Sequence, residues 1–416
     1  MKTTPSQPSA PTVGAVQRDT AAQPKATAPA YHEPSPTPSP TSGFWGGDAA
    51  SGPKIRGDQQ QRLAFLGVLD QIARYGGGLR KSTSLELDRF INALRGGYIP
   101  PSPGGDPLIN PESVPTGNNL TSISAECTPT EEAWRVGRRL ADELLAQHKA
   151  NTGNYPRRVA FTLWGGEFIR GKGTTIAEIL YLIGVRPVWN SRGSVNDVEV
   201  IPSEELGRPR IDVLVQTSGQ FRDAAASRIT LMDKAVQIVS ALEDEASPNF
   251  VRDGSEGTEM QLKNLGYSPK EAREFATARI YGSAENRSYG TGIMGVVEKG
   301  DTWKDEKQVA DRYVQNMGGI YRDGAHWGTY KKGLLEAQMQ GTEIVVQPRS
   351  SNTWGPLSLD HVYEFMGGMT LAVRVKTGAD PVGYFSDLRA RGRPKLTTAI
   401  GAIREEARTT VWNPKY

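Results

Sequence analysis

The chain has 416 residues, with 49 lysines and arginines against 46 aspartates and glutamates and a formal net charge of +3. This length predicts two or three domains with a substantial core, and the near-balanced charge argues against a nucleic-acid groove or a membrane-surface patch. The single cysteine, Cys127, excludes a disulfide framework and any cysteine-cluster metal site. The sequence has no apolar run of bilayer-spanning length and no secretory pattern. We therefore expect a cytoplasmic protein with no nucleic-acid partner and no membrane span.

The first segment, residues 1–57, is rich in Pro, Ser, Thr and Ala and has few large apolar side chains. Such a segment buries too little surface to offset the entropy of ordering. It predicts a disordered, low-complexity tail. The simplest interpretation of this tail is a spacer, and the functional one is a tether or a docking arm for a partner.

Residues 58–156 are predicted to form a helical region with a Pro/Gly-rich loop. Apolar residues from Leu63 to Ile72 follow helical spacing and lead into a glycine run, which predicts that the first helix ends there. A second helical stretch covers residues 85–96. The passage 96–120 is dense in Pro and Gly and predicts a long ordered loop, which is either functional or a covering segment.

A further helix is predicted after this loop. Thr128-Pro129-Thr130-Glu131 has the pattern of a capping box with Pro at the first helical position. Apolar residues continue at helical spacing through Trp134, and the helix is predicted to stop near Gly153.

The pattern changes to α/β over residues 157–250. Apolar runs at 158–164 and 211–216 predict buried strands, and each is followed by a turn and an amphipathic helix. This order predicts an α/β fold with a parallel or mixed sheet flanked by helices, and residues 251–416 read as a mixed α/β region. Ligands of open α/β sheets bind beyond the carboxyl ends of the strands. The two loops nominated by this rule are 164–173 and 218–223.

The first nominated loop resembles a phosphate-binding P-loop. Gly166 to Gly173 has the required glycine spacing and a lysine, Lys172, between a strand and a helix. The hydroxyl residue that holds Mg²⁺ is missing, because Gly173 follows the lysine and Thr174 is displaced by one position. No Walker B strand stands out either. The sequence therefore argues against nucleotide hydrolysis by this chain.

The second nominated loop is rich in charged residues. Arg208 and Arg210 lie at the entrance to a strand that begins near Asp212, and Arg222 and Asp223 lie beyond its exit. Arginine suits carboxylate recognition because it donates two parallel hydrogen bonds. Two interpretations stay open: the residues bind an anionic ligand, or they form internal ion pairs that lock the loops to the sheet.

Several long motifs resemble one family. The runs RVAFTLWGGEFIRGKGTTIAEILYLIGVRPVW, VEVIPSEELGRPRIDVLVQTSGQFRDA and LMDKAVQIVSALEDE are similar to the large subunit shared by CobN-type cobaltochelatase and magnesium chelatase. The similarity continues through ARIYGSAENRSYGTGI, EFMGGMTLAVRV and the terminal RTTVWNPKY, and back into the Pro/Gly-rich loop, so it covers roughly residues 58–416. The segments at Tyr289 to Gly292 and Pro115 to Gly117 look more like the cobalt branch.

The resemblance implies a ligase-type, ATP-dependent chelatase component that inserts Co²⁺ into a corrinoid of the hydrogenobyrinic acid a,c-diamide type in cobalamin biosynthesis. ATP would be used by AAA+ partner subunits and not bound here. The reaction needs a base for the pyrrolic protons and a cavity for the macrocycle. Aromatic residues such as Phe221 either stack on the ring or belong to the core. The candidate substrate-binding residues are Trp164, Glu167, Arg208, Arg210, Asp212, Ser218, Arg222, Asp223 and Tyr289.

The chain also departs from the family. The family's His-Gly-containing segment that ends in a Leu-Glu-Trp-Leu-Pro-Gly-Lys type motif is absent, and the four histidines, His32, His148, His326 and His361, are scattered. We therefore assign no catalytic residue and no metal ligand, and we expect a split subunit beside a separate chain with the missing region, a degenerate copy, or a fragment. The alternatives are a non-catalytic tetrapyrrole-binding or scaffold protein and Mg²⁺ insertion into protoporphyrin.

Overall fold

The computed structural model describes residues 57–104, 113–121, 124–243, 246–284, 290–322, 324–352, 354–390 and 393–415. Internal contacts divide the chain into two units, Met1–Ala64 and Phe65–Tyr416. The tail predicted for residues 1–57 lies outside the described residues, apart from its last position. The following description concerns the second unit, together with the helix that leads into it.

The first helix, α1 (Gly57–Leu94), continues through the glycine run at Gly76 to Gly78. The prediction that the helix ends at these glycines was wrong. None of the three takes the left-handed conformation that glycine provides at a helix end. The run has a packing role instead, since a side chain at Gly78 would approach the Val114 side chain to 3.1 Å. Glycine therefore lets the Pro/Gly-rich loop lie directly on the helix.

The Pro/Gly-rich loop contains a short parallel pair, β1 (Pro101–Pro103) and β2 (Asn119–Thr121). The next element, α2, covers Glu131–Thr152 and follows the short helical turn η2 (Ala125–Cys127). Thr130 caps α2 by accepting a hydrogen bond from the Ala133 amide. The predicted cap at Thr128 was therefore wrong by two residues, whereas the predicted end at Gly153, which has a φ of 81°, is confirmed.

Eight strands form the main sheet, in the order β12-β11-β10-β3-β6-β7-β8-β9. The five strands from β11 to β7 are parallel, and the others are antiparallel to their neighbours. The strand bounds are β3 Arg158–Leu163, β6 Asp212–Thr217, β7 Ile280–Gly282, β8 Gly319–Tyr321, β9 Trp327–Tyr330, β10 Thr342–Arg349, β11 Val382–Asp387 and β12 Lys395–Thr398. A separate hairpin consists of β4 (Val185–Trp189) and β5 (Val195–Val200). The sheet takes strands from both 157–250 and 251–416, so these regions are continuous in space.

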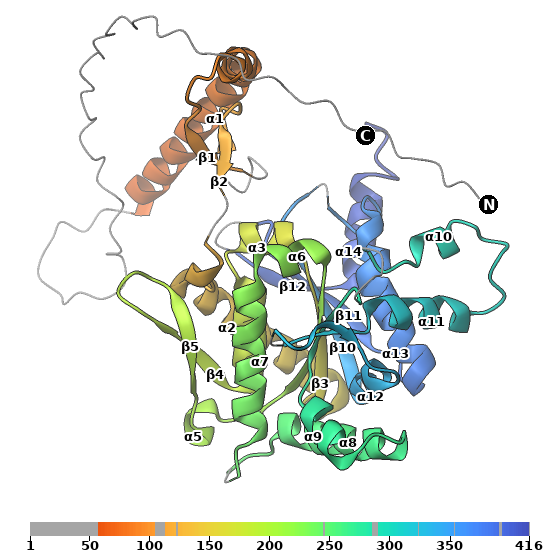
Figure 1. Ribbon diagram of the computed structural model, residues 1–416. Coiled ribbons are helices and arrows are strands. Elements are labelled where there is room, and N and C mark those ends of the chain that lie inside the picture. Colours follow the sequence, from red (N-terminus) through yellow and green to blue (C-terminus); the bar gives the residue numbers. More distant parts are fainter. Residues whose placement is uncertain are drawn as a thin grey trace, which may run out of the picture. The chain divides into compact units, whose positions relative to one another are not determined.

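The parallel strands lie between two helical layers (Figure 1). Alternate residues of these strands face one layer or the other. In β3, Val159 and Phe161 face one layer and Ala160 faces the other, as the side-chain alternation of a strand requires. One layer contains α2, α4 (Thr174–Ile183) and α7 (Ala226–Ser240). The other contains α9 (Pro269–Ala276), α11 (Glu306–Met317), α12 (Leu334–Met339) and α13 (Gly368–Thr377). The predicted α/β class with a mixed sheet flanked by helices is confirmed.

The remaining helices are α3 Gly165–Gly171, α5 Ser203–Leu206, α6 Gly219–Ala224, α8 Phe250–Asn264, α10 Met294–Val297, α14 Ala399–Thr409 and the π-helical turn η3 Val362–Gly367. No helix of the described residues is both long and apolar enough to cross a bilayer.

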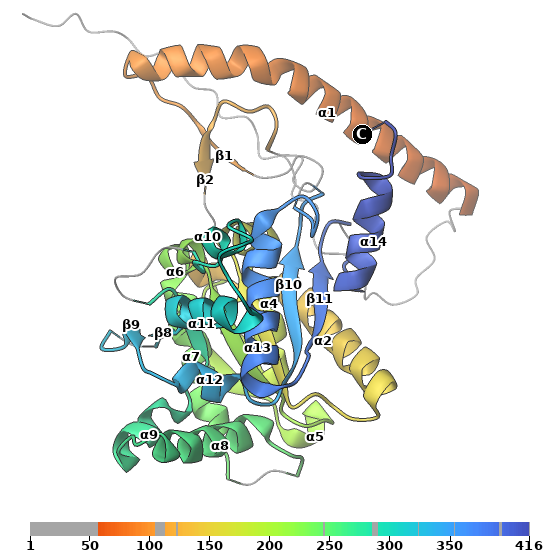
Figure 2. The same cartoon turned by 90° about the vertical axis from the view of Figure 1, so that its right-hand side faces the viewer.

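The strand β3 marks the point where the chain changes direction along the sheet. From β3 the chain proceeds through α4 to β6 on one side. On the other side the sheet is extended by β10 and β11, which lie side by side in Figure 2. The helices that follow β3 and β10 belong to opposite layers. Such a switch point opens a crevice at the carboxyl ends of the two strands. The segments after β3, β6 and β10 therefore define the place to examine for a site.

Candidate functional site

The parallel strands end in polar side chains that are buried: Thr162 in β3, Gln216 in β6, Gln347 in β10 and Asp387 in β11. Thr162 Oγ1 donates to Gln347 Oε1 at 2.9 Å and so links β3 to β10. The Tyr313 hydroxyl of α11 donates to Gln216 Oε1 at 2.8 Å. Buried polar groups are costly unless they are hydrogen-bonded. We call this end of the sheet the carboxyl edge.

The turn from β3 into α3 carries Trp164 and Glu167, two of the predicted site residues. Glu167 is 4% exposed, and its Oε1 lies 3.4 Å from Nη2 of Arg170. Its Oε2 is buried without a hydrogen-bond partner among the described residues, and so is Trp164 Nε1. A buried polar atom without a protein partner is a candidate for contact with a bound water or ligand. Two such atoms lie here within four residues.

Arg170 connects this turn to the segment that follows β10. Its Nε donates to Ser350 Oγ at 2.9 Å, and its guanidinium lies 3.7 Å from the ring centroid of Trp354. A side chain at Gly166 would approach the Trp354 ring to 3.0 Å, so the close fit depends on glycine at this position. Both sides of the switch point are thus joined by one arginine.

The turn from β6 into α6 carries Ser218, Arg222 and Asp223. Ser218 caps α6 by accepting from the Phe221 amide at 3.2 Å. Arg222 donates to Asp223 Oδ1 at 2.8 Å and to the Tyr321 hydroxyl at 3.2 Å, and the bond to Asp223 raises the pKa of Arg222. Its side chain is 20% exposed, so the guanidinium is positioned and still reachable from solvent.

Phe221 belongs to the core. Its side chain is fully buried and packs edge-on against Phe168 at 5.3 Å. Of the two interpretations for this ring, the structure supports packing.

Arg208 and Arg210 lie at the opposite, amino-terminal end of β6. Arg208 donates to the carbonyls of Tyr181 and Leu182 at 2.6 and 3.1 Å, and its burial lowers its pKa. Arg210 donates to Gly184 O and Ile201 O, each at 2.7 Å. Both guanidiniums therefore bind main-chain carbonyls at the end of α4 and nearby. The expectation that they join a substrate site at the carboxyl edge does not fit this placement.

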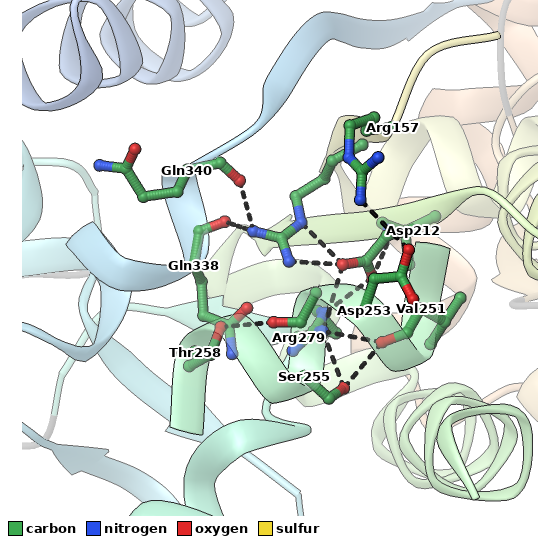
Figure 3. Close-up of polar contacts among 12 residues, drawn as sticks. Arg157, Asp212, Val251, Asp253, Ser255, Thr258, Arg279, Gln338 and Gln340 are labelled. Atoms are coloured by element: carbon green, nitrogen blue, oxygen red, sulfur yellow. Dashed lines mark hydrogen bonds and ion pairs between the residues drawn. The ribbon is translucent and has the colours of Figure 1, made fainter. Parts of the chain in front are cut away.

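Asp212 also lies at the amino-terminal end of β6, between two buried arginines (Figure 3). Its Oδ1 lies 2.8 Å from Arg279 Nε, and its Oδ2 lies 2.9 Å from Arg158 Nε. Arg158 also donates to the carbonyls of Gln338 and Gln340, and Arg279 also donates to Ser255 Oγ at 3.0 Å. For Asp212 the internal ion-pair interpretation is the one that the structure supports.

The near P-loop at 166–173 differs in geometry from a phosphate cradle. Residues Gly165–Gly171 form helix α3, which Lys172 ends with a φ of 50°. The amides of Lys172 and Gly173 bond to the carbonyls of Ile169 and Phe168. Both amides are therefore already hydrogen-bonded to carbonyls at the end of α3. Tyr289, the remaining predicted site residue, lies outside the described residues.

His361 and Glu364 were not predicted, yet they lie at the carboxyl edge. His361 packs edge-on against Trp164, with ring centroids 5.0 Å apart, and its Nδ1 lies 3.2 Å from Glu364 Oε2. The available signal was the i,i+3 spacing of His361 and Glu364, where Glu364 begins the EFMGGMTLAVRV segment. It was missed because neither the strand before them nor its position beside β3 is evident from local sequence.

Glu178 is an unusual carboxyl group on α4. It is fully buried, and Ser386 Oγ of β11 donates to its Oε2 at 2.8 Å. Burial raises the pKa of Glu178 to about 8, which keeps the group largely protonated at neutral pH. Its neutral form makes it suited to packing between α4 and the sheet.

No group of three or more His, Cys, Asp or Glu side chains within the described part of the chain has the geometry to hold a metal ion. Cys127 is free and partly exposed, and its Sγ lies 3.7 Å from Ser194 Oγ.

Comparison with known proteins decides the family. The family model described as CobN/Magnesium Chelatase matches residues 12–416. The chain belongs to the CobN/magnesium chelatase family. It is 33% identical to the aerobic cobaltochelatase subunit CobN of Pseudomonas aeruginosa and 33% identical to the chloroplastic magnesium-chelatase subunit ChlH of Oryza sativa, in each case over 80% of this chain.

A solved cobaltochelatase structure shares the fold. The catalytic subunit of cobaltochelatase from Mycobacterium tuberculosis matches with a TM-score of 0.74 and 32% identity over 80% of this chain. The chain spans about a quarter of the length of these relatives: 26% of the CobN sequence, 23% of the ChlH sequence and 28% of the solved chain. Family membership thus covers both cobalt and magnesium chelatase subunits.

Proposed function

We propose that this chain is a component of an ATP-dependent chelatase that inserts Co²⁺ into a corrinoid tetrapyrrole, a ligase-type reaction of cobalamin biosynthesis in the cytoplasm. Family membership supports a chelatase role, and the motifs around Tyr289 and Pro115 favour the cobalt branch. Co²⁺ is a substrate here. Mg²⁺ insertion into protoporphyrin is the second candidate, because magnesium chelatase subunits are similar to this chain at the same level of identity.

The observation that carries the proposal is the carboxyl edge. Arg222 is held by Asp223 and Tyr321 but stays partly exposed, and Trp164 and Glu167 have buried polar atoms without partners among the described residues. Tetrapyrroles of this class carry peripheral carboxylates and amides, which arginine recognises well. We assign the substrate-binding role to Trp164, Glu167, Ser218, Arg222 and Asp223, with Tyr289 as a further candidate, and exclude Arg208, Arg210 and Asp212.

ATP hydrolysis is assigned to AAA+ partner subunits. The geometry of α3 and Lys172, whose amides are used within the helix end, supports this assignment. A separate chain that carries other large-subunit sequence is a further partner in this proposal.

The surface of α1 suits such a partner chain. Large apolar side chains are exposed along it, and monomeric proteins rarely expose so many together. They include Phe65, Leu66, Val68, Leu69, Ile72, Leu79, Leu87, Phe90 and Leu94. Replacement of Leu69 and Phe90 by Asp is expected to abolish co-purification with a chain that carries the remaining large-subunit sequence. Undiminished co-purification would assign the contact to another surface.

The site is tested by titration of the purified chain with a metal-free corrinoid, in which the absorbance change reports binding. Wild-type protein is expected to bind, and Arg222→Ala is expected to bind at least tenfold more weakly. Arg157→Ala is the matched control, because Arg157 is also partly exposed but lies at the amino end of β3 in a surface pair with Asp253. Equal loss in both variants would remove Arg222 from the site.

Metal insertion separates the catalytic role from a non-catalytic scaffold role. The assay combines this chain, the AAA+ subunits, ATP and a chain that supplies the remaining sequence, with Co²⁺ or Mg²⁺ and the matching macrocycle. ATP-dependent insertion that requires this chain supports the chelatase. Binding of the macrocycle without insertion by either metal would favour the scaffold.

A further inference from the structure

His361 lies at the start of η3, in the segment that follows β10. Its ring contacts Trp164 at 5.0 Å and Phe365 at 6.2 Å between centroids, both edge-on. Trp164 follows β3, so His361 is held at the switch point between β3 and β10 by aromatic contacts from two segments. The His361 side chain is 50% exposed. A fixed and accessible imidazole therefore packs against the ring of Trp164, whose Nε1 is buried without a partner among the described residues.

Glu364 orients this imidazole. Its side chain is 7% exposed, and its two oxygens have separate partners. Oε1 accepts from the Thr291 amide at 3.0 Å and from Thr291 Oγ1 at 2.9 Å, whereas Oε2 lies 3.2 Å from His361 Nδ1. Gly290 permits this arrangement, since a side chain there would approach Glu364 Oε1 to 2.7 Å. The hydrogen bonds from Thr291 thus fix the Glu364 carboxylate in the position from which it contacts His361.

The pairing selects one tautomer of His361. A carboxylate accepts, so the proton of the neutral ring lies on Nδ1 and the lone pair lies on Nε2. Asp360 Oδ1 lies 3.4 Å from the same Nδ1 and favours the same tautomer. The interactions of His361 with charged side chains in the described part of the chain all involve Nδ1. Both residues lie at or within a π-helical turn, a rare conformation that is frequent at functional sites.

We propose that His361 is the proton acceptor of the insertion reaction and that Glu364 is its positioning residue. This inference rests on the chelatase function proposed above. Nε2 takes the proton of a pyrrolic N–H, and the electron pair left on that nitrogen binds the incoming divalent metal. The imidazolium, paired with Glu364, releases its proton to water through its exposed side. The step then repeats for the second N–H, so two protons leave for each metal ion inserted.

The test uses the reconstituted complex and measures macrocycle binding and the insertion rate separately. His361→Ala is expected to bind metal-free macrocycle within about twofold of wild type and to lose about a hundredfold or more in kcat, the usual contribution of a general base. Added imidazole is expected to restore part of the rate. His326→Ala is the matched control, because His326 also pairs with a glutamate, Glu274, and packs edge-on against a phenylalanine, Phe275.

Glu364→Gln tests the positioning role. A glutamine amide can still accept from Thr291, but its N–H donors face His361 and favour the tautomer with the proton on Nε2. This variant is expected to lose kcat with little change in KM or in the thermal unfolding midpoint, and imidazole is not expected to rescue it. Insertion at the wild-type rate by His361→Ala would overturn the inference and leave the chelatase function intact. Absence of insertion by the wild-type complex would overturn both.

Discussion

Arg279 Nε lies 2.8 Å from Asp212 Oδ1, and both side chains are buried. The same carboxylate also pairs with buried Arg158, so two positive charges share one negative charge at the amino end of β3 and β6. Main-chain carbonyls and the Ser255 hydroxyl accept further hydrogen bonds from the two guanidiniums (Figure 3). The network ties α8, α12 and three segments of the sheet together, far from the carboxyl edge.

Asp212→Ala is expected to destabilise the chain by about 3–5 kcal/mol, because it leaves two buried guanidiniums without a counter-charge. Urea unfolding followed by circular dichroism measures the change. Asp253→Ala is the control, since that carboxylate is 39% exposed and pairs with Arg157 on the surface. It should cost under about 1 kcal/mol. Similar losses for the two variants would contradict the importance of the buried network.

Gly254→Ala is expected to destabilise by about 1–3 kcal/mol through overpacking. A Cβ at this position of α8 would lie 2.1 Å from Asp212 Oδ2 and 2.5 Å from Arg158 Nη2, and both groups are fixed by their ion pairs. Gly257→Ala, three residues along the same helix, meets nothing within 4 Å and should stabilise by up to about 1 kcal/mol. Thermal unfolding of the two variants is expected to shift in opposite directions.

Glu178→Gln is expected to stabilise the chain increasingly as the pH rises from about 5 to 8. The pKa of Glu178 is raised from 4.5 to about 8 in the folded chain, so between these values the folded chain holds a proton that the unfolded chain has lost. Wild-type stability therefore falls with rising pH in this window, by about 1.4 kcal/mol per unit at most. Glutamine removes this dependence and can still accept from Ser386. Urea unfolding at several pH values measures the free energy of unfolding of both proteins. A difference between these free energies that does not change with pH would contradict the raised pKa.

Arg208→Ala is expected to reduce the stability of the chain, whereas Arg222→Ala is expected to weaken macrocycle binding. Arg208 binds carbonyls in the last turn of α4, so its loss should destabilise the chain by about 2–4 kcal/mol. Arg222 lies at the partly exposed carboxyl edge, so its loss should leave the unfolding midpoint nearly unchanged and weaken macrocycle binding. Thermal unfolding and corrinoid titration of both variants give the comparison. Unfolding of the Arg222 variant would show that its contacts to Asp223 and Tyr321 are structural.

The sequence allowed the central strands and two of the loops at the carboxyl edge to be predicted. The apolar runs of β3 and β6 and the helices after them follow from hydrophobic periodicity. The rule for parallel sheets then selects Trp164 to Gly173 and Ser218 to Asp223. Applied strictly, the same rule excludes Arg208 and Arg210, because residues before a parallel strand lie at the opposite edge.

Other features depended on contacts that local sequence does not encode. His361 lies at the edge only because β10 pairs with β3, and the two strands are distant in sequence. The glycine run of α1 was misread for a similar reason, since glycine at a helix end and glycine under a close tertiary contact look alike in sequence.

The pairing of β3 with β10 also matters while the chain is being synthesised. Thr162 and Gln347, which share a hydrogen bond across this pair, are 185 positions apart. A nascent chain therefore emerges with one edge of its central strand unpaired, and that edge belongs to an apolar strand. Exposed edges of this kind favour intermolecular pairing. Newly made chains should need protection by chaperones until β10 has left the ribosome.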